Sequence, residues 1–235
     1  MKKYLFLGAK RTGKTTNMIL LAKILAKLKK KVLVVDTSFD QGIKSFFCFN
    51  SDIESLNPLE DSKTIIRDDF EIVFGQQYKT FDINRLKEYN LEKYDYVFYE
   101  GDINVPMDLI HSAERVFLFQ DGDKAALYEN KDILGKINIE ENKIIIVFNS
   151  MLNIEYGPMY LLSELVKYIK IKDLSKVNEN IEILFDERNL GIIQEGKMNG
   201  KIDLKKLTDE YKGALFDFIN IIEKVDIKNF KKIAK

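Results

Sequence analysis

The chain has 235 residues, of which 46% are hydrophobic and 31% are charged, so its composition excludes an intrinsically disordered protein. Lys plus Arg and Asp plus Glu both number 37, which gives zero formal net charge. The overall charge therefore does not indicate a nucleic-acid partner. The single cysteine, Cys48, excludes an internal disulfide and fits a reducing compartment. Neither a secretory signal nor an apolar stretch of roughly 18–20 residues is present, so we expect a cytoplasmic protein.

The chain starts with a short apolar strand that leads into a glycine-rich loop. Residues 3–7 are prone to β structure, and residues 8–15 (GAKRTGKT) fit the phosphate-binding pattern G-x-x-x-x-G-K-[ST]. Residues 15–28 contain no Gly or Pro and predict a helix. Strand, loop and helix form the context that this motif requires, and the positive end of the helix would point at bound phosphates. We therefore predict nucleotide binding; the alternative is a glycine-rich turn that binds nothing.

The residue types of the loop match the chemistry of phosphate binding. Gly8 and Gly13 stand where a Cβ atom would crowd the phosphates or the turn. Lys14 is expected to reach the β- and γ-phosphates, Thr15 to ligate Mg²⁺, and Thr16 to add a hydroxyl contact to phosphate. The backbone N–H groups that surround the phosphates would come from these positions together with Ala9, Lys10, Arg11 and Thr12.

Apolar runs and helical patterns then alternate to the end of the chain. Further strands are predicted at residues 32–36, 70–74, 94–99, 115–119, 143–148 and 180–185, and helices at residues 84–91, 105–113, 123–135, 157–170 and 204–225. Continuous apolar strands separated by helices predict an α/β fold: a mostly parallel twisted sheet of about seven strands with helices on both faces. No linker or repeat divides the sequence, so we expect one domain over residues 1–235.

Two segments depart from this alternation. Residues 38–69 are irregular and follow the second strand, where open α/β folds place ligand loops; they form either a mobile loop that reorganises around nucleotide or a plain surface excursion. Residues 226–235 repeat an apolar residue every three positions among lysines. That segment is either a basic amphipathic tail for an anionic membrane or a frayed final helix with a solvated lysine face.

Polar residues end three of the predicted strands. Asp36 either holds a magnesium-bound water or positions an attacking one, or it caps the next turn. Glu100 stands where a phosphate-loop enzyme needs an acid near Mg²⁺, with Asp102 as the alternative. Asn149 has an amide that suits a nucleobase edge, although an Asn-Ser pair also starts turns. No N-K-x-D sequence is present to indicate guanine.

The order of these features resembles the ParA/MinD group of P-loop ATPases (the SIMIBI class), whose phosphate loop deviates from the common form. The resemblance rests on the loop with its two threonines and on residues 31–36 (KVLVVD), 94–99 (YDYVFY, similar to the family's YDYVIID), 109–119 and 183–186, followed by Gly200. The 183–186 segment is similar to one that flanks the adenine in the family, which adds Asp186 to the expected nucleotide site. The resemblance implies ATP and Mg²⁺ as cofactors, a nucleotide-dependent homodimer, and action as a spatial switch on DNA or membrane.

Three departures from the family pattern concern hydrolysis. The family's signature lysine, which reaches across the dimer, would fall at Ala9; either Lys10, one position later, or Arg11, two positions later, could replace it. The second acid after the second strand falls at Ser38, with Asp40 nearby, and the acid of the fourth strand is Glu in place of Asp. Losing one transition-state contact commonly costs ~10²–10³ in rate. We therefore expect ATP binding with weak or slow hydrolysis.

Two function hypotheses follow. The first is an ATP-binding switch in partitioning or spatial positioning, with Lys14, Asp36 and Glu100 as catalytic residues and Thr15, Asp36 and Glu100 around the metal. The alternative is a catalytically inactive scaffold of a pilus, secretion or conjugation machinery. A tyrosine-kinase-like phosphotransferase is disfavoured because Tyr211 is the last tyrosine and the chain has no tyrosine-rich tail. The sequence leaves the protein partner open, and leaves contact with a membrane or with the nucleoid open.

Overall fold

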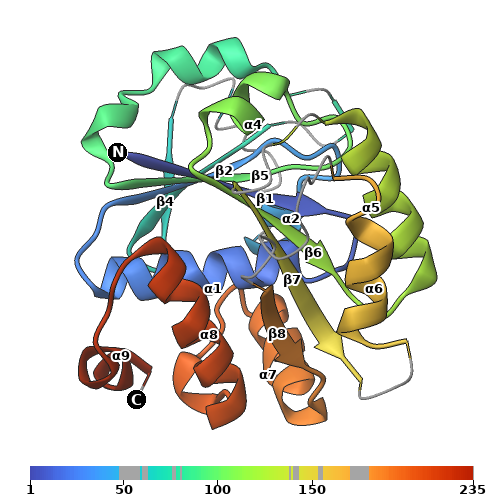
Figure 1. Ribbon diagram of the computed structural model, residues 1–235. Helices are drawn as coiled ribbons and strands as arrows, with labels where there is room; N and C mark the ends of the chain where they lie inside the picture. Colours follow the sequence, from blue (N-terminus) through green and yellow to red (C-terminus); the bar gives the residue numbers. More distant parts are fainter. Residues whose placement is uncertain are drawn as a thin grey trace.

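A computed structural model describes residues 1–47, 59, 63–75, 78–79, 81–137, 139, 143–152, 156–169 and 180–234. Its centre is a sheet in the order β3-β4-β2-β5-β1-β6-β7-β8 (Figure 1). The strands are β1 (Lys2–Gly8), β2 (Val32–Asp36), β3 (Ile65–Arg67), β4 (Phe70–Phe74), β5 (Tyr96–Glu100), β6 (Arg115–Gln120), β7 (Ile144–Met151) and β8 (Asn180–Leu184). All neighbouring pairs are parallel except β3–β4, so the expected mostly parallel α/β sheet is confirmed.

The central strands are apolar throughout because both of their faces are covered. Successive side chains of a strand point to opposite faces. In β1, Phe6 packs into one hydrophobic cluster and Leu5 and Leu7 into the other. Each face therefore needs its own layer of helices, and the molecule has three layers.

One face is covered by α1 (Lys14–Lys27), α2 (Gly42–Phe47), α8 (Asp209–Ile222) and α9 (Ile227–Ala234), and α7 (Glu187–Met198) packs at its edge. The opposite face is covered by α4 (Met107–Ser112), α5 (Lys124–Lys136) and α6 (Pro158–Leu165) (Figure 1). α1 is buried along almost its whole length, because it lies between the sheet and α8. This burial explains why its sequence is apolar on nearly all sides.

Several elements differ from the sequence expectation. β3 is an eighth strand, short and antiparallel, that the pattern did not indicate. Residues 83–88 and 91–93 form 3₁₀ turns where a helix over 84–91 was expected, and the helix expected over 204–225 divides into a 3₁₀ turn (Leu204–Lys206) and α8. α2 and α7 were not predicted. Within residues 38–69 the structure describes α2 and β3; Cys48 lies outside the described residues.

The C-terminal segment is a helix whose apolar side faces the protein. Phe230 and Ala234 of α9 are buried, and the Phe230 ring packs edge-on against Phe216 of α8. The Lys27 ammonium donates a hydrogen bond to the Ile233 carbonyl oxygen at 3.0 Å. The periodic apolar residues of this segment thus stabilise the fold, with Ile227 left exposed. No helix in the described part of the chain combines the length and apolarity needed to cross a membrane.

Candidate nucleotide-binding site

The loop between β1 and α1 is held in shape by two glycines with positive φ. Gly8 has φ +139°, and a Cβ there would lie 2.6 Å from the Phe119 carbonyl oxygen of β6. Gly13 has φ +89°, and a Cβ there would overlap the side-chain amide of Asn149. Both positions therefore demand glycine for conformation and for space. Glycine is therefore required at these two positions by the neighbouring strands β6 and β7, as well as by the phosphates that the loop would face.

Hydrogen bonds hold the loop closed around its own carbonyl groups. The Lys14 ammonium is buried and donates to the carbonyl oxygens of Gly8 at 2.8 Å and Ala9 at 3.4 Å. The Thr12 hydroxyl donates to the Ala9 carbonyl at 2.9 Å, and the Ala9 N–H donates to the Asn130 side chain at 2.8 Å. The loop is therefore preformed, with its cation already inside it.

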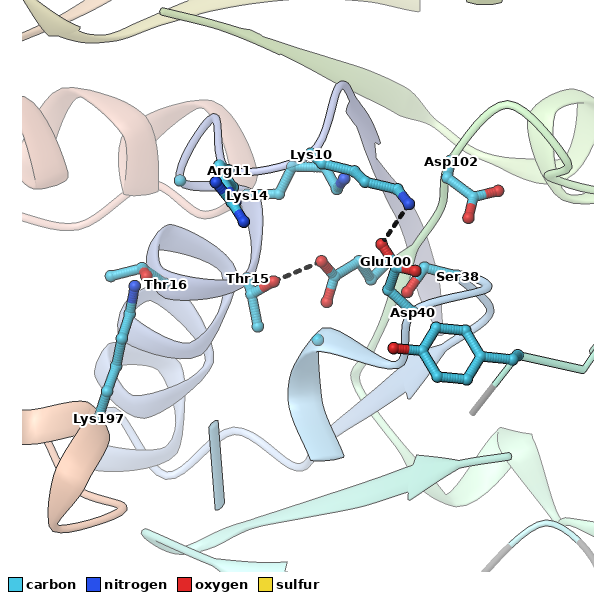
Figure 2. A pocket seen from close by; sticks show the side chains of 13 residues that line it. Lys10, Arg11, Lys14, Thr15, Thr16, Ser38, Asp40, Glu100, Asp102 and Lys197 are labelled. Carbon is cyan, nitrogen blue, oxygen red and sulfur yellow. Dashed lines mark hydrogen bonds and ion pairs between the residues drawn. The ribbon is translucent and has the colours of Figure 1, made fainter. Parts of the chain in front are cut away.

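Thr15 and Glu100 meet at the start of α1. The Thr15 hydroxyl donates to Glu100 Oε1 (Figure 2). The backbone of Gly42 approaches so closely that a Cβ there would lie 2.7 Å from Thr15 Oγ1. Glu100 is buried, and its Oε2 has no hydrogen-bond partner within the described part of the chain. A buried carboxylate oxygen without a donor is a costly arrangement unless a cation or a proton satisfies it. A hydroxyl, a carboxylate oxygen and phosphate oxygens are the ligands Mg²⁺ prefers, so these residues fit that ion.

Asp36 ends β2 directly beside Glu100, and the two residues are register partners in the sheet. Its carboxylate is fully buried, and Asp36 does not line the cavity beside Thr15 and Glu100 that is described below. It accepts hydrogen bonds from the Ser38 N–H at 2.9 Å, the Ser38 hydroxyl at 2.6 Å and the Ile43 N–H at 2.8 Å. The Asp36 carboxylate thus holds the turn that leads to α2, in agreement with the capping alternative. That Asp36 positions a water molecule stays a prediction.

The two carboxyl groups are buried together, which changes their protonation. Burial raises the pKa of Asp36 well above its usual value, and the nearby charge of Glu100 adds to the rise; the hydrogen bonds from Ser38 and Ile43 oppose it. Burial also raises the pKa of Glu100, against the opposing effects of Lys14 and Thr15. Two acids that resist ionisation at the end of neighbouring strands form a site prepared for positive charge.

This burial predicts a pH-dependent gain in stability when Glu100 is replaced by Gln. The ordinary pKa of a Glu carboxyl is 4.5 and the folded value is higher, so in the wild type the unfolded chain releases this proton first as the pH rises. As the pH rises from the pKa of the unfolded state to that of the folded state, the Glu100 carboxyl therefore lowers the free energy of unfolding of wild type. Gln does not titrate, so the variant lacks this loss. In urea denaturation without nucleotide, the free energy of unfolding of Glu100→Gln minus that of wild type should increase from about pH 4 toward pH 8. Asp209→Asn, at a carboxylate 98% exposed, is the control; a difference that shrinks for Glu100→Gln would contradict the prediction.

Lys14, Thr15 and Glu100 line a cavity of about 520 Å³. Its lining includes four cations, Lys10, Arg11, Lys14 and Lys197, and three carboxylates, Asp40, Glu100 and Asp102. Lys10 forms an ion pair with Asp40 at 2.8 Å, while Asp102 accepts hydrogen bonds from the Phe39 N–H at 2.7 Å and the Asn104 N–H at 2.8 Å (Figure 2). Asp40 and Asp102 are thus engaged within the protein, whereas Arg11, Lys14 and Lys197 form no ion pair with a described acid and can meet an anionic ligand.

A second cavity, of about 120 Å³, adjoins the first on the side of β7 and α7. Asn149 and Asp186 both line it. The Asn149 side-chain oxygen accepts a hydrogen bond from Asn17 at 3.2 Å, and the Tyr211 hydroxyl donates to the Asn17 side-chain oxygen at 3.1 Å. Asp186 caps α7 by accepting from the Asn189 N–H at 2.8 Å. The amide of Asn149 is therefore held by Asn17 of α1, which is held in turn by Tyr211 of α8.

Three lining residues, Asn17, Tyr211 and Lys197, were missed by the sequence reasoning. Asn17 follows Thr16 near the start of α1, and a polar side chain just before a long apolar stretch was the available signal. Lys197 belongs to α7, which the pattern did not predict, whereas Tyr211 belongs to α8, within the helix expected over 204–225. Of the predicted residues, the two cavities are lined by Lys10, Arg11, Gly13, Lys14, Thr15, Thr16, Glu100, Asn149 and Asp186. Gly8, Ala9 and Thr12 are buried in the loop itself.

No protein-family sequence model matches this chain, and no curated protein sequence matches it significantly. Solved structures do match. The ParA family ATPase of Chlorobium tepidum TLS has a TM-score of 0.62 at 13% identity, covering 93% of this chain and 98% of that one. The septum site-determining protein MinD of Pyrococcus horikoshii OT3, complexed with Mg-ADP, has a TM-score of 0.61 at 17% identity over 97% and 99%.

A putative plasmid partition protein of Borrelia burgdorferi B31, bound to AMPPNP, has a TM-score of 0.61 at 16% identity over 99% of this chain and 98% of that one. These matches extend over nearly the full length at low identity. The chain therefore has the fold of the ParA/MinD ATPases, as its sequence features led us to expect.

Proposed function

We propose that this chain, whose fold is that of the ParA/MinD ATPases, binds ATP with Mg²⁺ and uses it as a switch for homodimerisation. The observation that carries the proposal is the preformed phosphate loop, with the Lys14 ammonium inside it and the Thr15–Glu100 pair at its end. Backbone N–H groups and the first turn of α1 supply further positive potential for phosphate. Lys14 would exchange its bonds to the loop carbonyls for bonds to phosphate oxygens.

The base is proposed to occupy the second cavity, beside Asn149. Asn17 donates to the Asn149 side-chain oxygen, which fixes the direction of the amide and turns its NH₂ group toward Ser150. An amide held in one orientation can distinguish bases by their hydrogen-bonding edges. The choice of adenine rests on the resemblance to the ParA/MinD ATPases, which implies ATP.

The metal is proposed to lie between Thr15, Glu100 and the phosphates. When bound, Mg²⁺ would neutralise phosphate charge and orient the terminal phosphate. The protein's own contribution is to keep Glu100 dry and its Oε2 without a competing donor, so that the carboxylate is available to the ion. Asp36 stands behind Glu100 and supports the turn after β2.

Slow hydrolysis is proposed because Asp36 is engaged. To position water, its carboxylate must release at least one of the three hydrogen bonds from Ser38 and Ile43. Ser38 also stands where the family fold would have a second acid. The engagement of Asp36 also favours the alternative function, a catalytically inactive scaffold that does not hydrolyse ATP.

The proposal is tested by calorimetry of the purified chain with ATP and ADP in Mg²⁺, with light scattering of the same samples. ATP binding accompanied by a shift from monomer to dimer is the expected result. Absence of binding would leave the scaffold, whose partner would then be sought by pull-down. Robust Mg²⁺-dependent turnover that Asp36→Ala abolishes would exclude the scaffold.

A further inference from the structure

The two cavities meet at a short boundary, and this boundary is defined by a small set of residues. Arg11, Gly13, Thr16 and Lys197 line both of them. A nucleoside polyphosphate has its phosphates at one end and its base at the other. If the phosphates occupy the larger cavity and the base the smaller, the phosphate nearest the ribose must lie at this boundary.

Lys197 reaches the boundary from the side opposite to the phosphate loop. It belongs to the last turn of α7, and its side chain extends away from that helix toward the first turn of α1, where Thr16 lies (Figure 2). Its ammonium makes no hydrogen bond or ion pair with any residue in the described ranges. An unpaired cation directed into a cavity is a group prepared for an anionic ligand.

Lys197 is exposed to solvent, and protein surrounds part of its side chain. This partial burial lowers the pKa of the ammonium, because loss of water disfavours the charged form. A phosphate at hydrogen-bonding distance would stabilise the charged form. Arg11 stands across the boundary, so the anion would be approached by cations from α7 and from the loop.

We propose that Lys197 binds the phosphate nearest the ribose and closes the nucleotide site from the α7 side. This inference rests on the proposed ATP binding and adds to it a residue outside the motif. Lys14 acts at the far end of the phosphate chain, so the two lysines predict different responses to the length of that chain.

The test measures the affinities of ATP, ADP, AMP and adenosine for wild type, Lys197→Met and Lys14→Met, by calorimetry and by competition. Lys197→Met should weaken ATP, ADP and AMP by similar factors of about tenfold and leave adenosine unchanged. Lys14→Met should weaken ATP more than AMP. Lys197→Arg should keep most of the affinity, and Lys228→Met, which removes an exposed lysine of α9 from neither cavity, should behave as wild type.

Equal ATP affinity of Lys197→Met and wild type would overturn the inference while leaving ATP binding intact. An equal loss on adenosine would also overturn it, because the effect would then not involve phosphate. If wild type binds none of the four compounds, the proposed function itself fails. Since Lys197 makes no hydrogen bond or ion pair with a described residue, the thermal unfolding midpoint of Lys197→Met should stay within about 2 °C of wild type. This measurement separates loss of a phosphate contact from loss of the fold.

Discussion

Replacing Lys14 with Met is expected to weaken ATP binding about 100-fold, the largest change in affinity that we predict. Hydrogen bonds to charged groups contribute about 1.5–3 kcal/mol each, and 1.4 kcal/mol corresponds to a factor of about ten. The Lys14 ammonium already lies inside the loop, 2.8 Å from the Gly8 carbonyl oxygen, so little reorganisation is required for it to meet phosphate. Calorimetry with ATP and Mg²⁺ measures the loss directly.

The same substitution should also abolish ATP-dependent dimerisation in light scattering at ATP concentrations that saturate wild type. Met retains the aliphatic length of Lys, so the packing of the buried stem is preserved and the charge is removed. Lys228→Met is the matched control, because it makes the same substitution at an exposed lysine of α9 that lines neither cavity. A Lys14→Met variant that kept both wild-type ATP affinity and dimerisation would contradict the proposed function.

Replacing Glu100 with Gln is expected to remove most of the effect of Mg²⁺ on ATP binding. In wild type, the affinity for ATP should be at least about tenfold higher with Mg²⁺ than with a chelator; in the variant the two values should nearly coincide. Gln keeps an oxygen that can accept from Thr15, so the contact seen in the structure is preserved and only the charge is lost. Any ATP turnover should fall by about 10²–10³.

Asp102→Asn provides the comparison for this variant. Asp102 also lines the cavity, but its oxygens accept from the Phe39 and Asn104 N–H groups, and it should be dispensable for the metal effect. If Asp102→Asn removed the Mg²⁺ effect and Glu100→Gln did not, the alternative acid considered from the sequence would be the metal ligand. The proposed metal arrangement would then be wrong.

The phosphate loop and the layered fold could be predicted from the sequence because their signals are local. The sequence from β1 to α1 carries the motif and its context in one short stretch. Each central strand is a continuous apolar run, and burial on both faces of a parallel sheet requires such runs. Parallel strands end at one edge of the sheet, so the sequence alone predicts Glu100 and Asn149 near the loop.

Contacts between distant segments were decided only by the tertiary structure. Asn17, Asn149 and Tyr211 form one hydrogen-bonded chain although they are far apart in sequence, and no local pattern indicates their proximity. The partners of Asp36 depend on how the turn after β2 folds back. Likewise β3 is short, so it has no periodicity of its own to read, and its position is set by pairing with β4.

Lys197 illustrates the division most directly. By sequence it is one lysine among many in a chain whose charges sum to zero. Its place at the boundary of the two cavities arises because β8 and α7 carry it back to the edge of the sheet where the phosphate loop lies. The sequence alone determined the phosphate loop, the sheet and the acid beside it, because each of these follows from neighbouring residues. The tertiary structure decided which distant side chains complete the site, because that depends on the packing of the whole chain.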